Sequence, residues 1–259
     1  MTWTTRPRSD FGALRAIIAG DGPTVLFIHG VGLRAEAWNA QIDAMSERFR
    51  VVAVDMPGHG ESPPPGEDLN LSDYTDAIAQ GLEAPALVIG HSMGAMIALD
   101  MAMRHPHLVR GVVAMNAIFQ RDHAASKAVQ TRARSLDGVT VAGPSGPLTR
   151  WFGDAPSPEQ SACQRWLTSV DPAGYRMAYT VFAHENGPRP SALAALTCPA
   201  LFVTGQDEPN STPAMSKAMA NLAPKGRTQI IEGAAHMMPM THVAQVNAAL
   251  LDFAQEITT

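Results

Sequence analysis

Residues 90–94 read Gly-His-Ser-Met-Gly and lie between an apolar run, Ala86–Ile89, and a helix-like run, Ala95–Met103. The pattern is G-x-S-x-G in the order strand, sharp turn, helix, which is the context that presents a serine as a nucleophile. Such a turn is sterically tight, so the glycines of the motif occupy places that tolerate no bulky side chain. The sequence therefore predicts that Ser92 is a nucleophile at the carboxyl end of a strand.

Two backbone N–H groups are placed to stabilise an anion that forms on the substrate. The predicted helix after the serine has unpaired N–H groups and the positive end of its dipole in its first turn, which begins at Met93. Another apolar run, Thr24–Ile28, leads into His-Gly-Val-Gly at residues 29–32, and a glycine-flanked turn there can direct a second N–H to the same point. We predict an oxyanion hole formed by Val31 and Met93. One base suffices for this chemistry, so we expect His29 to hold its loop by a hydrogen bond.

An acid and a histidine follow the serine along the chain, each after another apolar run. Pro199–Thr204 leads into Gly-Gln-Asp-Glu-Pro at residues 205–209, and Thr228–Ile231 leads into a loop that ends at His236. The order serine, acid, histidine is that of the α/β-hydrolases and differs from the orders of other serine-hydrolase folds. We predict His236 as the general base.

The chain resembles the α/β-hydrolase superfamily over nearly its whole length, in particular its small bacterial esterases, enol-lactonases and carbon–carbon bond hydrolases. The resemblance rests on the motifs above and on Asp-Met-Pro-Gly-His-Gly-Glu-Ser at residues 55–62. It implies acyl transfer to water through an acyl-enzyme. Ser92 attacks a carbonyl carbon, and His236 takes its proton and later returns one to the leaving group.

The carboxylate that orients His236 is one of two neighbouring residues. Members of the family usually carry an Asp three residues after the glycine that ends this strand, and that place holds Glu208, with Asp207 one place earlier. Neighbouring side chains on an extended segment point in opposite directions, so both cannot face the histidine. Position favours Glu208, whereas Asp207 has the usual side chain. Asn116, at another strand end that can carry the acid, is an amide and cannot serve.

Apolar runs alternate with helix-like runs before residue 118, which indicates an α/β fold with a mostly parallel sheet and helices on both faces. The expected strands are 24–29, 50–55, 86–90 and 109–116, and the expected helices are about 35–48, 72–82 and 92–104. From residue 119 to 196 only the short run Val139–Val141 has strand character. The resemblance implies that residues 119–196 form a helical cap over the active site, inserted into a core domain of residues 1–118 and 197–259.

The predicted cap has an aromatic stripe and a small excess of positive charge. Tyr175, Tyr179 and Phe182 are spaced i, i+4, i+7 on one helix face, which we expect mainly to form the core of the cap. Eight basic residues between positions 119 and 196 outnumber six acidic ones. A basic cap over an acidic body suits a carboxylate-bearing substrate, but a solvated surface gives the same count, and we favour the surface.

Composition excludes several classes of partner. The chain has 259 residues, 46% of them hydrophobic, and a formal net charge of -5 without a basic stripe, which argues against nucleic acid. Its apolar runs are too short to span a membrane, and the first residues lack the apolar region of a signal peptide. Two cysteines form no disulfide framework, so we expect a cytoplasmic protein. With neither a metal-ligand cluster nor a phosphate-binding glycine loop, we expect no cofactor.

These observations predict a hydrolase of a small-molecule carboxylic ester or lactone. Within the superfamily, a serine at the motif argues against haloalkane dehalogenases and epoxide hydrolases, which use an aspartate there. One alternative is a carbon–carbon bond hydrolase of a dicarbonyl-type substrate. Another is a small-molecule receptor that keeps the same residues, because the site and not the fold determines function.

Overall fold

The computed structural model describes residues 3–64, 66 and 69–258. Its eight-stranded sheet has the order β1-β2-β4-β3-β5-β6-β7-β8. The strands β4, β3, β5, β6, β7 and β8 pair in parallel. Strands β1 and β2 form an antiparallel extension at one edge, which the sequence pattern did not predict. The bounds are β1 (Ser9–Phe11), β2 (Leu14–Ala19), β3 (Thr24–Ile28), β4 (Arg50–Val54), β5 (Ala86–His91), β6 (Val109–Met115), β7 (Ala200–Gly205) and β8 (Gly226–Ile231).

Helices cover both faces of the sheet, which confirms the predicted α/β-hydrolase fold. In β3, Leu26 and Ile28 pack in the core beneath α2, α3 and α9, whereas Val25 and Phe27 pack in the opposite core beneath α1 and α11. Successive strand side chains point to opposite faces, so a strand covered on both sides reads as a continuous apolar run. These helices are α1 (Asn39–Met45), α2 (Leu71–Ala79), α3 (Met93–Arg104), α9 (Pro213–Leu222) and α11 (Val243–Thr258).

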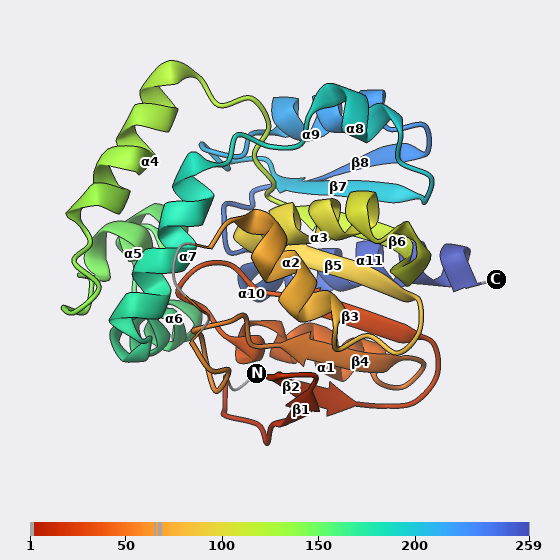
Figure 1. Cartoon of the computed structure of the whole chain (residues 1–259), viewed down its shortest axis with the longest axis horizontal. Helices are drawn as coiled ribbons and strands as arrows, with labels where there is room; N and C mark the ends of the chain where they lie inside the picture. Colours follow the sequence, from red (N-terminus) through yellow and green to blue (C-terminus); the bar gives the residue numbers. More distant parts are fainter. Residues whose placement is uncertain (1–2, 65, 67–68, 259) are drawn as a thin grey trace.

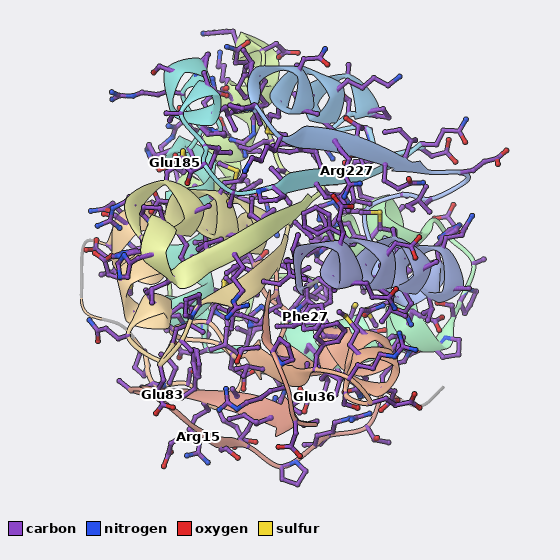
Figure 2. All side chains as sticks on the ribbon, turned by 90° about the vertical axis from the view of Figure 1, so that its right-hand side faces the viewer. Arg15, Phe27, Glu36, Glu83, Glu185 and Arg227 are labelled. Carbon is purple, nitrogen blue, oxygen red and sulfur yellow. The ribbon has the colours of Figure 1, made fainter. Side chains whose placement is uncertain are left out.

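Charged side chains surround this apolar interior. Figure 2 shows Phe27 within the molecule and Arg15 and Glu83 toward its periphery, in agreement with the complete burial of Phe27. Short elements complete the body: η1 (Ala35–Trp38), η2 (Pro106–Leu108) and α10 (Met238–Thr241). The single helix expected over residues 35–48 is thus divided between η1 and α1. In the part of the chain that the structure describes, no helix is both long and apolar enough to cross a bilayer.

The helices within residues 123–184 lie beside one end of the sheet, apart from the helices that cover its faces, whereas the short helix Pro190–Ala194 lies next to α9 (Figure 1). Asp122, Ser157 and Asp171 begin three of the helices as N-caps whose side chains accept backbone N–H groups. The strand character expected at Val139–Val141 was wrong, because these residues are exposed and lie in a bend and the irregular segment after it. The helices are α4 (His123–Ser135), α5 (Ser145–Phe152), α6 (Pro158–Ser169), α7 (Pro172–His184) and α8 (Pro190–Ala194).

Candidate active site

Ser92 occupies the sharp turn between β5 and α3. Its backbone has φ 57° and ψ −119°, a conformation that residues other than glycine rarely adopt and that marks stored strain. Its N–H donates to the carbonyl of Met115 in β6 (2.9 Å), and its carbonyl accepts the N–H of Ala95 (3.0 Å). The turn is therefore held from the sheet and from the helix, and Ser92 lines a cavity.

Glu208, and not Asp207, reaches the histidine. The Nδ1 of His236 lies 2.8 Å from Oε2 of Glu208, while Oε1 accepts the N–H groups of Asn210 (2.8 Å) and Ser211 (3.2 Å). Glu208 is 2% exposed, and Asp207 is exposed. Burial raises the pKa of Glu208, but the nearby His236 and the two N–H groups lower it further, to about 2. The ionised carboxylate therefore keeps the proton of neutral His236 on Nδ1 and leaves Nε2 as the acceptor.

The loop that carries His236 is held by two side chains whose roles the sequence did not reveal. Nδ2 of Asn116 donates to the carbonyl of His236 (2.7 Å), and Nε2 of His91 donates to the same carbonyl (2.8 Å). Asn116 has φ 50°, which asparagine tolerates better than most residues. The ring of Trp151 from α5 stacks on that of His236, with centroids 5.7 Å apart. The histidine is thus fixed by its carboxylate, its backbone and one face of its ring.

The turn at Val31 lies beside the serine. The N–H of Leu33 donates to the carbonyl of Gly30 (3.2 Å), and Gly32 has φ +76°, as the third position of a type II turn requires. A methyl group on Gly30 would lie 3.1 Å from Cβ of Ser92, so the loop approaches Ser92 closely. Val31 lines the cavity with Ser92. On the other side, Met93 is the first residue of α3, and its N–H has no partner within the helix.

A cavity of about 370 Å³ opens above Ser92 and is lined by the sheet ends and by residues 119–196. Tyr175, Tyr179 and Phe182 line it from α7, in addition to the packing role that we expected for this stripe. Tyr175 also belongs to a buried cluster with Trp166 and Leu33 that joins the helical segment to loops and helices of the body. The aromatic stripe therefore serves both packing and the wall of the cavity.

Arg121, Arg132 and Arg150 also line this cavity. The guanidinium of Arg132 lies 5.4 Å from the ring centroid of Tyr179 and donates to Oη of Tyr175 (3.4 Å). Arg121 is 8% exposed, stacks 4.4 Å from the centroid of Phe182, and burial lowers its pKa to about 10. Among the described residues that line the cavity, these three arginines are accompanied by a single carboxylate, that of Asp122. The excess positive charge that we expected on the surface therefore includes residues that face the cavity.

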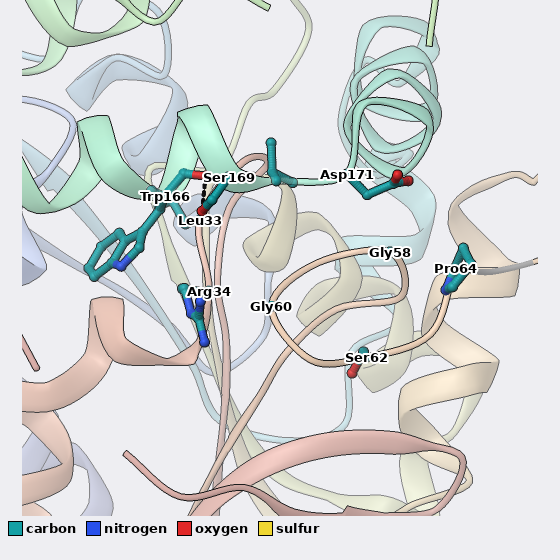
Figure 3. A pocket seen from close by; sticks show the side chains of 10 residues that line it. Leu33, Arg34, Gly58, Gly60, Ser62, Pro64, Trp166, Ser169 and Asp171 are labelled. Atoms are coloured by element: carbon teal, nitrogen blue, oxygen red, sulfur yellow. Dashed lines mark hydrogen bonds between the residues drawn. The ribbon is translucent and has the colours of Figure 1, made fainter. Parts of the chain in front are cut away.

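A second cavity and the possible metal ligands are also candidate sites. A smaller cavity of about 80 Å³ lies between the loop Gly58–Pro64 and the connection from α6 to α7 (Figure 3), and Ser92 does not line it. No group of three or more His, Cys, Asp or Glu side chains is arranged to hold a metal ion among the residues described.

Residues 25–249 match a family described as "Alpha/beta hydrolase family". The chain belongs to this α/β-hydrolase family. It is 37% identical over 238 residues, 89% of this chain and 90% of the other, to an (E)-2-((N-methylformamido)methylene)succinate hydrolase of Acinetobacter baylyi. Over 46% of this chain and 50% of the other, it is 39% identical to a pimeloyl-[acyl-carrier protein] methyl ester esterase of Chromobacterium violaceum. These similarities support a hydrolase.

Solved structures of the α/β-hydrolase family share its fold. A thermophilic esterase from Thermogutta terrifontis superposes with a TM-score of 0.85 at 24% identity, covering 98% of this chain and all of the other. The enol-lactonase from Burkholderia xenovorans gives a TM-score of 0.82 at 21% identity, covering 96% of this chain and all of the other. At this identity the likeness concerns the fold alone.

Proposed function

We propose that the protein is a serine hydrolase that cleaves the ester or lactone bond of a small carboxylate-bearing molecule through an acyl-enzyme. The observation that carries the proposal is the shared cavity. Ser92 and His236 line it together with three arginines of the helical segment, residues 119–196. We further propose that this segment acts as the cap of the active site, because it supplies those arginines.

Each step of the proposed reaction has a candidate group at the site. Ser92 Oγ attacks the carbonyl carbon while Nε2 of His236 takes its proton, and Glu208 stabilises the resulting imidazolium. The N–H groups of Val31 and Met93 bind the oxyanion. His236 then gives the proton to the leaving alkoxide, which completes the acyl-enzyme. A water molecule, deprotonated by the same histidine, releases the acid and restores the serine.

The arginines support a carboxylate on the substrate. A guanidinium presents parallel N–H groups that match a carboxylate, and such charged pairs are stronger than neutral hydrogen bonds. The stacking of Arg132 on Tyr179 holds its guanidinium in the cavity without occupying all its donors. The named substrate of the Acinetobacter baylyi relative, a substituted succinate, supports the same class.

The first test compares p-nitrophenyl esters from acetate to octanoate with the wild type and Ser92→Ala. Turnover that requires Ser92 supports the proposed ester or lactone hydrolysis, and the absence of turnover on every ester contradicts that reaction. The second test compares p-nitrophenyl hydrogen glutarate with p-nitrophenyl pentanoate, which has a similar chain without the charge. The wild type should prefer the charged ester. Arg132→Gln should lower kcat/KM for that ester about tenfold to a hundredfold, and leave the neutral ester within about twofold.

Arg165→Gln is the matched control, because Arg165 is exposed on α6 outside the cavity. This variant should leave kcat/KM unchanged for both esters. If Arg132→Gln lowers kcat/KM equally for both esters, the arginine does not bind the substrate carboxylate, and this part of the proposal fails.

A second candidate reaction is hydrolysis of an N-acyl enamine of a succinate. The name of the Acinetobacter baylyi relative, which places an N-methylformamido group on a methylene succinate, favours it. The same serine, histidine and N–H donors would attack the formyl carbon. Release of formate from such a compound by the wild type and not by Ser92→Ala, without turnover of esters, would establish this reaction in place of the first.

A further inference from the structure

Two buried histidines join the turn at Val31 to the neighbouring loop, Met56–Gly60. His29 precedes the turn, and its Nε2 accepts the N–H of Met56 (3.0 Å). His59 lies in the neighbouring loop, and its Nε2 accepts the N–H of Gly32 (3.0 Å). The two ring centroids are 5.4 Å apart. Each histidine thus holds the loop that carries the other.

The second nitrogen of each ring fixes its protonation. Nδ1 of His29 lies 2.8 Å from the carbonyl oxygen of Gly30, and Nδ1 of His59 lies 3.2 Å from that of Pro57. A backbone N–H can only donate and a carbonyl can only accept, so each ring must carry its proton on Nδ1 and none on Nε2. Burial lowers the pKa of His29 to about 3 and lowers that of His59, which keeps both rings neutral.

These bonds act on two successive peptide groups. The carbonyl of Gly30 and the N–H of Val31 belong to one planar peptide group, so the bond from His29 to the carbonyl oxygen sets the direction of the N–H. The next peptide group carries the N–H of Gly32, which His59 holds. In addition, the Met56 N–H donates to Nε2 of His29, and Nδ1 of the same ring donates to the Gly30 carbonyl oxygen. Because donor follows acceptor along this chain of hydrogen bonds, each bond strengthens the next. The N–H of Val31 is the last donor of this chain of bonds.

The neighbouring loop is itself confined. Figure 3 shows Gly58, Gly60 and Ser62 on a curved segment. This segment lies below the helix that starts after Asp171, and it shares a small cavity with Leu33. A methyl group on Gly174, in the first turn of α7, would clash with the carbonyl of Gly58. The loop therefore gives His59 a fixed base from which to hold the turn.

We propose that His29 and His59 are positioning residues that aim the Val31 N–H at the oxyanion of the transition state. The inference rests on the proposed function, which supplies that oxyanion. Neither histidine is among the described residues that line the cavity, so both act through the backbone of residues 30–32.

Crossed substitutions separate positioning from simple packing, because an Asn side chain places an amide near Nδ1 of a histidine and a Gln side chain places one near Nε2. His29→Asn keeps a donor for the Gly30 carbonyl, which His29→Gln loses. His59→Gln keeps an acceptor for the Gly32 N–H, which His59→Asn loses. Complete removal of an oxyanion donor costs about 10²- to 10³-fold in kcat, so a misdirected donor should cost about tenfold.

We expect kcat to be about tenfold higher for His29→Asn than for His29→Gln, and about tenfold higher for His59→Gln than for His59→Asn, with KM within about twofold. Active sites are counted with a fluorophosphonate that labels Ser92, so misfolded protein does not lower kcat. Equal kcat within each pair, or Asn better at both positions, would overturn the role, because a packing defect has no reason to follow this crossed order.

Nuclear magnetic resonance of the two rings tests the geometry independently of turnover. Long-range ¹H–¹⁵N spectra should show neutral rings with the proton on Nδ1 at pH 7, and a proton on Nε2 of either ring would overturn the arrangement. A wild type that neither hydrolyses esters nor takes the label would overturn the proposed function, and the role with it. Turnover and labelling without the crossed order would overturn the role alone.

Discussion

At the scale of single residues, Glu208 illustrates how a carboxylate is committed to one partner. Its two oxygens divide between His236 on one side and the N–H groups of Asn210 and Ser211 on the other. Because these groups favour the ionised form, its pKa lies at about 2, although burial alone would raise it. The carboxylate therefore stays charged throughout the range in which a histidine base can work.

Exchange of the two neighbouring acids for amides should have unequal effects. Glu208→Gln should lower kcat by about 10³- to 10⁴-fold, because the amide no longer stabilises the imidazolium or selects the tautomer of His236. Asp207→Asn should stay within about threefold of the wild type, since Asp207 is exposed. Steady-state kinetics on p-nitrophenyl butyrate checks both. Near-normal turnover by Glu208→Gln would mean that the buried pair is structural.

At the scale of elements, the turn between β5 and α3 depends on how closely the backbones approach. A methyl group on Gly94 would meet the carbonyl groups of Ile28 and His29 at the end of β3. The glycine therefore lets α3 begin directly against the strand that leads to Val31. This close approach brings the serine and the oxyanion turn together.

Gly94→Ala should destabilise the protein by about 3 kcal/mol, since the new methyl group displaces backbone rather than a flexible side chain. Gly146→Ala is the matched control, because a methyl group on Gly146, in α5, meets nothing within 4 Å. It should stabilise the protein by up to about 1 kcal/mol through helix propensity. Urea unfolding measures both. Equal stability of the two variants would show that the turn has room to adjust.

Much of this arrangement follows from local signals, and the remainder depends on distant contacts. The strands 24–28, 50–54, 86–91 and 109–115 carry their own apolar pattern, and the motif at Ser92 carries its own glycines. Strand β1 has three residues, too few to carry such a pattern, and the antiparallel pairing of β2 with β4 depends on residues far apart in the chain. Asn116 holds His236 across 120 residues. Likewise, the direction in which an arginine of α4 or α5 points depends on how the helix packs, which its sequence does not state.

At the scale of the whole molecule, the segment before β1 is anchored by buried charge. The side chain of Arg8 is fully buried and pairs with Glu36 (2.6 Å) and Asp55 (2.7 Å). Asp55 also accepts the N–H groups of Ala35 (2.8 Å) and Glu61 (3.0 Å). One carboxylate thus connects the first residues, η1 and the loop that carries His59.

Arg8→Met should destabilise the protein by about 3–5 kcal/mol, because it leaves two buried carboxylates without their cation. Arg6→Met removes a more exposed ion pair with Asp43 and should cost less than about 1 kcal/mol. Chemical denaturation distinguishes the two. A loss below about 1 kcal/mol for Arg8→Met would show that Arg34, which also contacts Glu36, suffices.

Stability should fall as the solution becomes acidic, well before the carboxylates titrate. Burial lowers the pKa of His29 and His91 to about 3 and lowers that of His59, whereas the unfolded chain binds these protons near pH 6.5. The stability is therefore complete above that pH and declines below it, by up to about 1.4 kcal/mol per pH unit for each histidine.

Thermal unfolding between pH 8 and 4 should show Tm falling steeply below about pH 6. His123→Gln, at an exposed position at the start of α4, should keep the same profile. A Tm that stays constant from pH 7 to 5 would contradict the neutral, buried state of these rings.

The order of the active-site residues along the chain has a consequence for biosynthesis. Ser92 and the Val31 turn belong to strands that emerge early from the ribosome, whereas His236 follows β8, the last strand of the sheet. Domains begin to fold as they are synthesised, from the N-terminal side. A nascent chain can therefore form the turn at Ser92 before His236 has been synthesised. Under the proposed mechanism, hydrolysis waits until the sheet is complete, and we expect products of premature termination before β8 to be inert.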